Sequence, residues 1–380
     1  MKDFAFAVPQ DIVFGMGSLA KLPGLLKKSG SENTFIISDR GLESLGVVKK
    51  ITDSIEAAGI KYATYLDVEA NPSVETVDQA TEAYKNSGAT SIIALGGGSP
   101  MDVAKAVGIL AKFGGQITAY EGAHLVPGKI VPLIAIPTTA GTGSEVTAFS
   151  VITDRSRNYK LTVFSYELIP SVALLDPSLI MSLPPSIAAA TGVDALIHAL
   201  EAYLSKAASP FSDAMAEKAM ELIGKHIRSF VADRSNVEAA SAMMSGSMFA
   251  GIAFAWARLG NVHAMAHPLG GFFNVTHGVA NAILLPTIVE YNALADTGRY
   301  EKIYNYIAKH PAYDFTPDML VDEIRALTSS LGIPQTLSEV GVTEDKIPDM
   351  AADAMKSGNI AINPRSSTQK DIEMLYRKAL

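Results

Sequence analysis

The 380-residue sequence contains no cysteine, which excludes disulfide bonds and every metal site built from thiolates. Any metal ion must therefore be held by histidine, aspartate or glutamate side chains. Charged residues make up 18% of the chain and the net charge is -8, and we find no local cluster of lysine and arginine that would override it. The sequence thus excludes nucleic acid as a partner and favours small partners of little charge.

Long apolar segments are also missing. Residues 1–15 lack the apolar core of a signal peptide, and the chain has no run of about eighteen apolar residues that would cross a membrane. We therefore expect a cytoplasmic protein without membrane contact. Its length exceeds that of one small domain, and its 48% hydrophobic content is typical of a globular enzyme.

The first part of the chain, up to about Asp176, alternates short β-branched runs with segments of helical periodicity. The runs lie at 34–39, 61–68, 90–98, 131–139 and 172–176, and amphipathic stretches such as 73–87 and 100–113 separate several of them. This alternation predicts βαβ units and a parallel sheet covered on both faces.

The second half differs in composition and in periodicity. After the sequence SLPPS (182–186), the chain is rich in alanine, methionine and leucine at helical spacing and shows no convincing strand. We predict an α/β domain over 1–180 and an all-helical domain over 181–380. The proline pair breaks the chain near this boundary, and Ser186 is expected to cap the next helix.

Two glycine- and threonine-rich loops each follow a predicted strand. The sequence LGGGSPMDVAKA (95–106) opens a helix, so its glycine amides and the helix N-terminus can cradle a pyrophosphate; the alternative is a tight turn that binds nothing. The second loop, PTTAGTGSEVT (137–147), offers hydroxyls and flexible backbone. Ligands of open α/β sheets bind at the carboxyl ends of strands, which favours a binding site here.

An earlier stretch, FGMGSLA (14–20), matches the weak pattern G-x-G-x-x-A, with Asp39 about twenty residues further on. Because the residues before it are interrupted by PQD, we interpret Gly15 and Gly17 as a turn into the first helix. Asp39 is still expected in the cofactor cleft, where a carboxylate accepts hydrogen bonds from a ribose diol and repels a 2′-phosphate. The alternative is a solvated aspartate at a strand end.

Histidines and one aspartate recur at helical spacing. Asp194 and His198 are four residues apart, His263 and His267 repeat that spacing, and His277 follows ten residues later. Each alone is typical of a structural histidine, but together they indicate a site for a divalent first-row metal. Spacing does not show which histidines between 263 and 277 are ligands. We assign no role to the remaining histidines, His124, His226 and His310.

The combination of GGGSPMDVAKA, PTTAGTGSE, GVDALIHALEAY and HAMAHPLGGFFNVTHG strongly resembles the iron-containing (group III) alcohol dehydrogenases, the family of the lactaldehyde and 1,3-propanediol oxidoreductases. The resemblance runs over nearly the whole chain, from FGMGSL to NPRSS at 363–367. It implies an N-terminal dinucleotide-binding α/β domain and an all-α C-terminal domain, as in the dehydroquinate synthase-like fold, with a metal in the cleft.

The resemblance also implies roles for individual residues. The metal ligands implied are Asp194, His198, His263 and His277, while His267 resembles a catalytic non-ligand histidine near the nicotinamide. Asp39 is implied on the adenosine ribose, and the other implied cofactor neighbours are Gly97, Gly98, Ser99, Asp102, Thr138, Thr139, Thr142 and Lys160. Phe254 is similar to an aromatic that lines the substrate pocket, although a core aromatic is an equal interpretation.

The expected activity is hydride transfer between NAD(H) and a small primary alcohol or aldehyde. The resemblance implies Fe²⁺, yet three imidazoles and a carboxylate would bind Zn²⁺ at least as tightly. It also favours a homo-oligomer of at least two chains, in which the stretch FAFAV (4–8) could pair across subunits. Two alternatives remain, a dehydroquinate synthase-type lyase, which needs a strongly basic pocket, and a nucleotide-binding regulator with a structural metal.

Overall fold

The computed structural model describes residues 4–157 and 159–380. Backbone contacts divide the chain into two compact units. One, called the α/β unit below, comprises Ala7–Thr139 and Gly143–Ile180. The other, called the helical unit, comprises Ala140–Thr142, Met181–Leu380 and the described part of Met1–Phe6.

A six-stranded sheet forms the centre of the α/β unit, with the strand order β1-β9-β6-β4-β2-β3 and parallel pairing throughout. Its strands are β1 (Asp11–Phe14), β2 (Asn33–Ile37), β3 (Lys61–Tyr65), β4 (Ser91–Gly96), β6 (Leu133–Pro137) and β9 (Val172–Leu175). The central strands β4 and β6 are buried along their whole length, as expected for a parallel sheet covered on both faces. The predicted fold class is confirmed for this unit.

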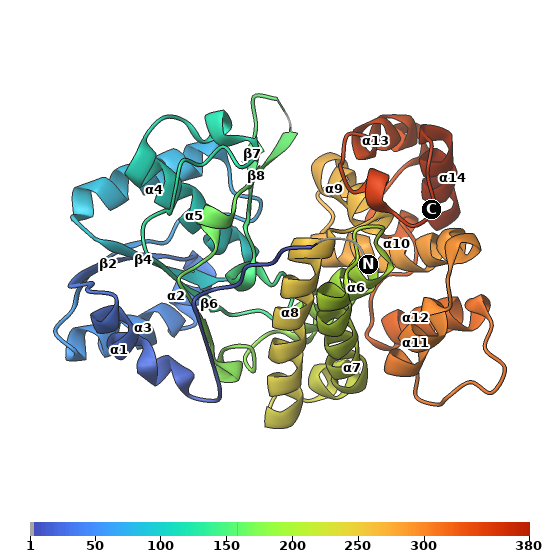
Figure 1. Cartoon of the computed structure of the whole chain (residues 1–380), viewed down its shortest axis with the longest axis horizontal. Helices are drawn as coiled ribbons and strands as arrows, with labels where there is room; N and C mark the ends of the chain where they lie inside the picture. Colours follow the sequence, from blue (N-terminus) through green and yellow to red (C-terminus); the bar gives the residue numbers. More distant parts are fainter. Residues whose placement is uncertain (1–3, 158) are drawn as a thin grey trace. The chain divides into compact units, whose positions relative to one another are not determined.

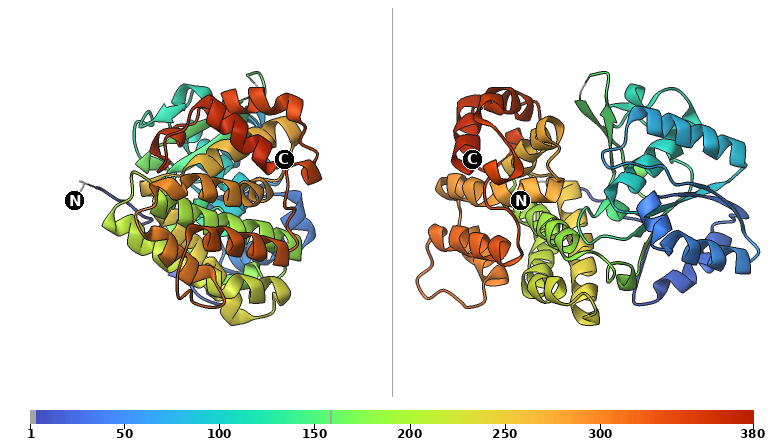
Figure 2. Two further views of the ribbon diagram at one scale, coloured as in Figure 1. Left: turned by 90° about the vertical axis from the view of Figure 1, so that its right-hand side faces the viewer. Right: turned by 180° about the vertical axis from the view of Figure 1, so that it is seen from behind.

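Helices cover both faces of this sheet (Figures 1 and 2). Alternate side chains of β4 enter two separate cores, with Ile92 and Ala94 in one and Ile93 and Leu95 in the other. Helices α4 and α5 close the first core, and α1 and α3 close the second. The helices of this unit are α1 (Leu22–Lys28), α2 (Arg40–Ser44), α3 (Val47–Ala57), α4 (Val74–Ser87) and α5 (Gly98–Phe113).

The sequence did not predict the edge strand β1 or a small second sheet of order β5-β8-β7. The strands of this second sheet are β5 (Gly122–Ala123), β7 (Phe149–Asp154) and β8 (Tyr159–Phe164). β7 and β8 pair antiparallel, and every second residue of β7 is partly exposed. Strands that are very short or half-exposed lack the continuous apolar run by which the central strands were recognised.

The turn predicted at the G-x-G pattern is confirmed. Gly17 has a φ of 72°, in the left-handed region that glycine adopts without strain. Its amide and that of Leu19 donate to the carboxylate of Asp176, each at 3.0 Å. These amides are therefore occupied by the chain's own carboxylate, which argues against a phosphate cradle here.

Most of the helical unit follows Ile180, and it holds the remaining α-helices of the described residues. They are α6 (Pro185–Leu204), α7 (Pro210–Ala232), α8 (Val237–Ala257), α9 (Asn261–Phe273), α10 (His277–Asn292), α11 (Arg299–Ile307), α12 (Pro317–Ser330), α13 (Ile347–Ala354) and α14 (Gln369–Ala379). Short 3₁₀ turns connect elements of both units: η1 (Ser18–Lys21), η2 (Ile117–Tyr120), η3 (Ser144–Val146), η4 (Tyr166–Leu168), η5 (Pro177–Leu179), η6 (Ala293–Ala295), η7 (Ser338–Val340), η8 (Glu344–Lys346) and η9 (Ile360–Ile362). The predicted all-helical second half is thereby confirmed.

Two of these helices, α6 and α8, are long and apolar enough to cross a membrane by length and composition. Their most apolar windows are 83% and 72% buried inside the protein, so both are core helices. The start of α6 corrects one expectation, because the residue before its first turn is Pro184 and Ser186 lies inside the helix. Pro185 begins the helix because its fixed φ suits the first helical position.

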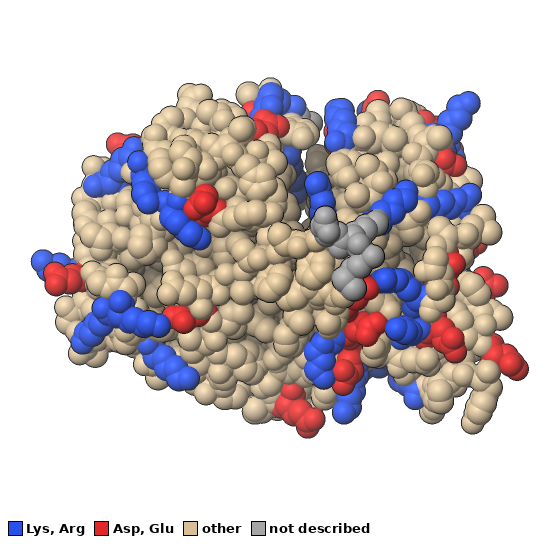
Figure 3. Space-filling model, in the orientation of Figure 1, with Lys and Arg blue, Asp and Glu red and all other residues tan. Residues whose placement is uncertain are grey.

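The charged surface agrees with the composition. On the face of the described residues drawn in Figure 3, basic and acidic side chains are interspersed and form no single basic patch.

Helices α6 and α10 pack closely against each other at a glycine. A Cβ atom at Gly278 would lie 2.4 Å from the carbonyl oxygen of Ala190, a separation that real Cβ atoms do not show. Gly278 follows His277, the first residue of α10, and Ala190 precedes Asp194 on α6 by one turn. The glycine therefore sets the spacing between two helices that carry candidate metal ligands.

We predict that Gly278→Ala lowers the free energy of unfolding by about 1–3 kcal/mol, because α10 must move away from α6. Gly271→Ala is the matched control, since a Cβ at that exposed position of α9 meets nothing within 4 Å. The control should be neutral or gain up to about 1 kcal/mol of helix stability. Chemical denaturation measures both, and equal stability of the two variants would contradict the close contact.

Candidate metal centre

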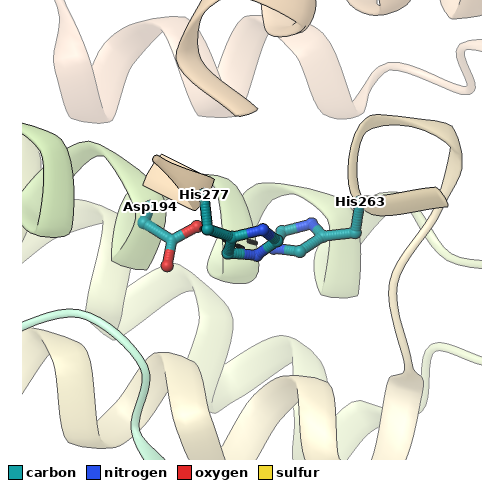
Figure 4. A group of neighbouring side chains, drawn as sticks. All are labelled: Asp194, His263 and His277. Atoms are coloured by element: carbon teal, nitrogen blue, oxygen red, sulfur yellow. Dashed lines mark ion pairs between the residues drawn. The ribbon is translucent and has the colours of Figure 1, made fainter. Parts of the chain in front are cut away.

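Three candidate ligands converge inside the helical unit. Asp194 of α6, His263 of α9 and His277 of α10 each offer one ligand atom, and these atoms all lie within 4.8 Å of one another (Figure 4). Asp194 Oδ1 is 3.6 Å from His263 Nε2 and 3.9 Å from His277 Nε2. Asp194 and His263 are buried, and His277 is partly exposed. One carboxylate and two imidazoles form a donor set that suits a divalent first-row metal.

The carboxylate of Glu201 contacts the imidazole of His263. His263 Nδ1 donates to Glu201 Oε2 at 2.6 Å, so Nδ1 carries a proton and Nε2 faces the other ligands. Glu201 was not predicted from the sequence. A signal was present, because Asp194, His198 and Glu201 follow at spacings of four and three residues and so share one face of α6.

Electrostatics at the cluster favour a bound cation. Burial raises the pKa of Asp194, but the charges of His198 and His277 outweigh it and hold this pKa well below its usual range. For His263, burial lowers the pKa, while hydrogen bonds to Asp194 and Glu201 overcome that effect and raise it to about 9. Two buried carboxylates thus attract positive charge, and a metal ion would compete with a proton at His263.

His198 lies beside this group on α6. Its ring stacks on that of His263 with centroids 4.6 Å apart, and burial lowers its pKa to about 4. His198 Nδ1 donates to the carbonyl oxygen of Gly141 at 3.3 Å, which leaves the lone pair on Nε2. Gly141 must be glycine because a Cβ there would lie 2.8 Å from Thr191 Cβ on the same helix. His198 is outside the three-residue group, so its role as a fourth ligand stays a prediction.

Phe254 and His267 flank the cluster. The ring of Phe254 on α8 stacks on His198 with centroids 4.5 Å apart and is partly exposed. His267 lies one turn after His263, is exposed, and stacks on His277 with centroids 5.5 Å apart. Both residues therefore neighbour the candidate ligands, and their predicted roles remain untested.

Asn281 lies one turn after His277 on α10, among the three candidate ligands. It was not predicted from the sequence. Its Nδ2 lies 2.7 Å from Asp194 Oδ1 and 3.1 Å from Nε2 of both His263 and His277. Its Oδ1 is buried and has no hydrogen-bond partner among the described residues. Three ligand atoms that all reach one nitrogen are arranged closely enough to share a small cation, so this donor set fits a metal ion.

The glycine-rich loop of the α/β unit joins β4 to α5. A Cβ at Gly96 would lie 2.6 Å from the ring of Pro100, so this turn is possible only with glycine. Gly97 precedes the first helical residue, Gly98, and gives the helix no side-chain cap. The amides of this first turn, including that of Ser99, are placed as an anion site requires.

The start of the second loop lies beside the first. β4 and β6 are paired, Thr138 N–H donates to Gly96 O at 3.0 Å, and a Cβ at Gly97 would lie 3.4 Å from Thr139 Oγ1. The structure thus brings the glycine loop, Thr138 and Thr139 together at the carboxyl ends of neighbouring strands. Thr142 belongs to the helical unit.

Asp39 follows β2 and caps α2. Its Oδ1 accepts the amide of Leu42 at 2.9 Å, and its side chain is partly exposed. This hydrogen bond gives Asp39 a structural role whether or not a ribose binds to it.

A buried lysine, which was not predicted from the sequence, ties α5 to the second loop. Lys105 Nζ donates to Ser144 O at 2.8 Å, Ser144 Oγ at 3.0 Å, Thr147 Oγ1 at 3.2 Å and Phe149 O at 2.8 Å. Burial lowers its pKa to about 8 against the charges of Asp102 and Glu145. This network anchors the backbone of the loop.

The predicted cofactor neighbour Asp102 lies near that lysine, and a second predicted neighbour, Lys160, lies near Asp102. Burial raises the pKa of Asp102 to about 6, although the charge of Lys105 opposes the shift. Burial also lowers the pKa of Lys160, which Asp102 partly offsets, and Lys160 Nζ donates to Asn71 Oδ1 at 2.7 Å. Asp102 and Lys160 therefore interact electrostatically, and their role in a cofactor site stays a prediction.

Glu145 gives this loop a pH dependence that can be tested. Burial raises its pKa from 4.5 to about 7, so the folded chain binds a proton more readily than the unfolded chain between these values. Relative to Glu145→Gln, the wild-type free energy of unfolding should fall by up to roughly 3 kcal/mol as pH rises through this window. Denaturation at several pH values, followed by circular dichroism, measures the difference. The exposed Glu82→Gln is the control, and parallel profiles of wild type and Glu145→Gln would refute the prediction.

Family models match both parts of the chain. Residues 9–177 match the model described as iron-containing alcohol dehydrogenase, and residues 188–380 match that of the C-terminal part of the Fe-containing alcohol dehydrogenase family. The chain is 38% identical to 1,3-propanediol dehydrogenase of Citrobacter freundii over 99% of this chain and 98% of the relative. It is 39% identical to lactaldehyde reductase of Escherichia coli K12 over 96% of this chain and 97% of that relative.

Solved structures agree with these sequence matches. The crystal structure of a 1,3-propanediol oxidoreductase superposes with a TM-score of 0.97 at 37% identity, over 100% of both chains. Sulfoacetaldehyde reductase of Bifidobacterium kashiwanohense, solved with NAD⁺, superposes with a TM-score of 0.91 at 31% identity, over 100% of this chain and 99% of that one. The likeness therefore covers sequence and fold along the whole chain.

Proposed function

The chain belongs to the iron-containing alcohol dehydrogenase family, and from this premise we propose that it transfers a hydride reversibly between NAD(H) and a small primary alcohol or its aldehyde. The observation that carries the proposal is the buried convergence of Asp194, His263 and His277. Relatives named for 1,3-propanediol and lactaldehyde support a short substrate. Both family models are those of alcohol dehydrogenases, which favours an oxidoreductase over the lyase and the regulator.

The proposed metal ligands are Asp194, His198, His263 and His277. A bound Fe²⁺ or Zn²⁺ would supply a Lewis acid for the substrate oxygen. The buried carboxylate of Asp194 contributes the charge that holds the ion, and the histidines contribute neutral nitrogens. Phe254, stacked on His198, excludes water from one side and limits the width of the substrate.

His267 is proposed to move the proton that alcohol oxidation releases. It is exposed to solvent and stacks on His277, so its ring connects the metal centre with water. Imidazole suits this task because its ordinary pKa lies near neutral pH.

NAD(H) is proposed to bind the α/β unit, in line with a division into a dinucleotide-binding domain, 1–180, and a metal-binding domain, 181–380. The first-turn amides at Gly97, Gly98 and Ser99 would hold the pyrophosphate. Asp39 would accept hydrogen bonds from the ribose. The further cofactor neighbours proposed are Asp102, Thr138, Thr139, Thr142 and Lys160.

We further propose a cytoplasmic homo-oligomer without nucleic-acid or membrane partners. Phe4 and Phe6 are 47% and 51% exposed, as expected of apolar side chains that another subunit covers.

His277→Ala should remove the metal and reduce kcat/KM to near background, because a site that loses one ligand holds its ion weakly. His267→Ala should keep the metal and slow turnover by about 10²-fold, with a changed pH profile. Elemental analysis and NADH-linked kinetics on the same preparations separate these outcomes. Equal metal loss in the two variants would make His267 a ligand instead.

Asp39 is expected to set the preference for NAD over NADP. Two charges about 4 Å apart interact by roughly 4 kcal/mol at an effective dielectric of about 20, and solvent reduces this. Asp39→Asn keeps an oxygen for the Leu42 amide but removes the charge, so kcat/KM should shift toward NADP by about tenfold or more. Asp39→Gly removes cap and charge together and should also weaken NAD. An unchanged ratio in both variants would leave Asp39 with its capping role alone.

A further inference from the structure

Glu201 is a buried carboxylate that the proposed mechanism does not use. We propose that Glu201 is the positioning residue of the metal centre: it caps α9 and, by accepting a hydrogen bond from the Nδ1–H group of His263, presents the Nε2 lone pair to the metal. The inference rests on the metal site proposed above.

The two carboxylate oxygens of Glu201 serve two different groups. Oε1 accepts the backbone amide of Val262 at 2.8 Å. Oε2 accepts His263 Nδ1 at 2.6 Å and also the His263 amide at 3.4 Å. One side chain of α6 thereby fixes both the start of α9 and the ring that this helix carries.

The first turn of α9 is shaped to receive this carboxylate. Gly260, which precedes the helix, provides no side-chain cap, and a Cβ there would lie 2.9 Å from Glu201 Oε1. Glycine at this position leaves room for the carboxylate to reach the amides. Since unpaired amides at a buried helix start are costly, the carboxylate takes the place of the missing cap.

Two residues from a later segment of the chain, Asn363 and Ser367, also bind the start of α9. The amide of Asn261 donates to Asn363 Oδ1 at 3.1 Å, and Asn261 Nδ2 donates to Ser367 Oγ at 2.7 Å. The amides of Asn261, Val262 and His263 are therefore all bound by side chains from outside α9. These bonds fix the start of α9, and the bond to Glu201 then holds the His263 ring at its Nδ1 side.

Only a carboxylate can satisfy both groups. An ionised glutamate accepts hydrogen bonds at both oxygens, whereas a glutamine has one accepting oxygen and one donating amide nitrogen. In Glu201→Gln the amide nitrogen must face either the Val262 N–H or His263 Nδ1. In the first case two donors oppose each other, and in the second the ring proton moves to Nε2 and blocks the metal position.

The test measures Zn²⁺ affinity of the full chain by competition with a chelator. Glu201→Gln should bind Zn²⁺ about 10- to 100-fold more weakly than wild type. In the Zn²⁺-loaded wild type, the His263 Nδ1 proton should give a far-downfield ¹H resonance, as a short bond to a carboxylate produces, correlated with ¹⁵N-labelled histidine. This resonance should be absent from Glu201→Gln at saturating Zn²⁺.

Glu217→Gln is the matched control. Glu217 is a partly buried carboxylate of the same unit whose Oε1 accepts from the Tyr203 hydroxyl at 2.6 Å. Its variant should keep both the affinity and the resonance. If Glu201→Gln does not fold, Glu201→Asp takes its place, because a carboxylate drawn back by one methylene should still cost about tenfold in Zn²⁺ affinity.

Zn²⁺ affinity within twofold of wild type would overturn the inference, as would weaker binding with the His263 resonance unchanged. A wild-type chain that binds no Zn²⁺ or Fe²⁺ would refute the proposed metal centre itself. The wild-type measurement thus tests the proposed function, and the difference between the glutamate variants tests the positioning role.

Discussion

The helical unit is organised around negative charge that has been removed from water. Asp194 and Glu201 lie on one helix, α6, and both carboxylates are almost completely buried. Burying an unpaired carboxylate is costly, so the surrounding structure must supply positive charge or hydrogen-bond donors. Imidazoles from α9 and α10, backbone amides of α9 and the amide of Asn281 meet that demand. The two carboxylates therefore bring together polar groups from three helices.

In the α/β unit the buried charge is positive instead of negative. Lys105 is buried on α5, and its ammonium group is surrounded by oxygens of the segment from Ser144 to Phe149. Its hydrogen bonds hold a loop that has little regular structure of its own. Glycines supply the complementary condition, because at Gly96 and Gly97 a larger residue would contact Pro100 or Thr139. Fixed backbone amides at these strand ends are what phosphate recognition requires.

The sequence predicted the elements whose signal is local. The buried strands β4 and β6 and the amphipathic helix α4 lie close to the predicted ranges, because their apolar pattern repeats within a few residues. The candidate site was found because Asp194 and His198, and likewise His263 and His267, are four residues apart. Which histidines converge came from family resemblance, since spacing alone left it open.

The residues that were missed act over long separations in the chain. Glu201 meets His263 across 62 residues, Asn281 meets Asp194 across 87, and Lys105 meets Ser144 across 39. No local sequence pattern indicates such a pair. A single charged residue in an apolar helix does not show which distant group it will contact. The edge strand β1 was missed for a different reason, because four half-exposed residues carry too little periodicity.

The bonds from residues 363–367 to the start of α9 have a consequence for biosynthesis. All four proposed ligands leave the ribosome with the first 277 residues, whereas Asn363 and Ser367 are synthesised after them. A nascent chain that stops before them has every metal-binding side chain but an unfinished α9 amide turn. The proposed metal centre would thus be completed only after residues 363–367 have been synthesised, well after its last ligand.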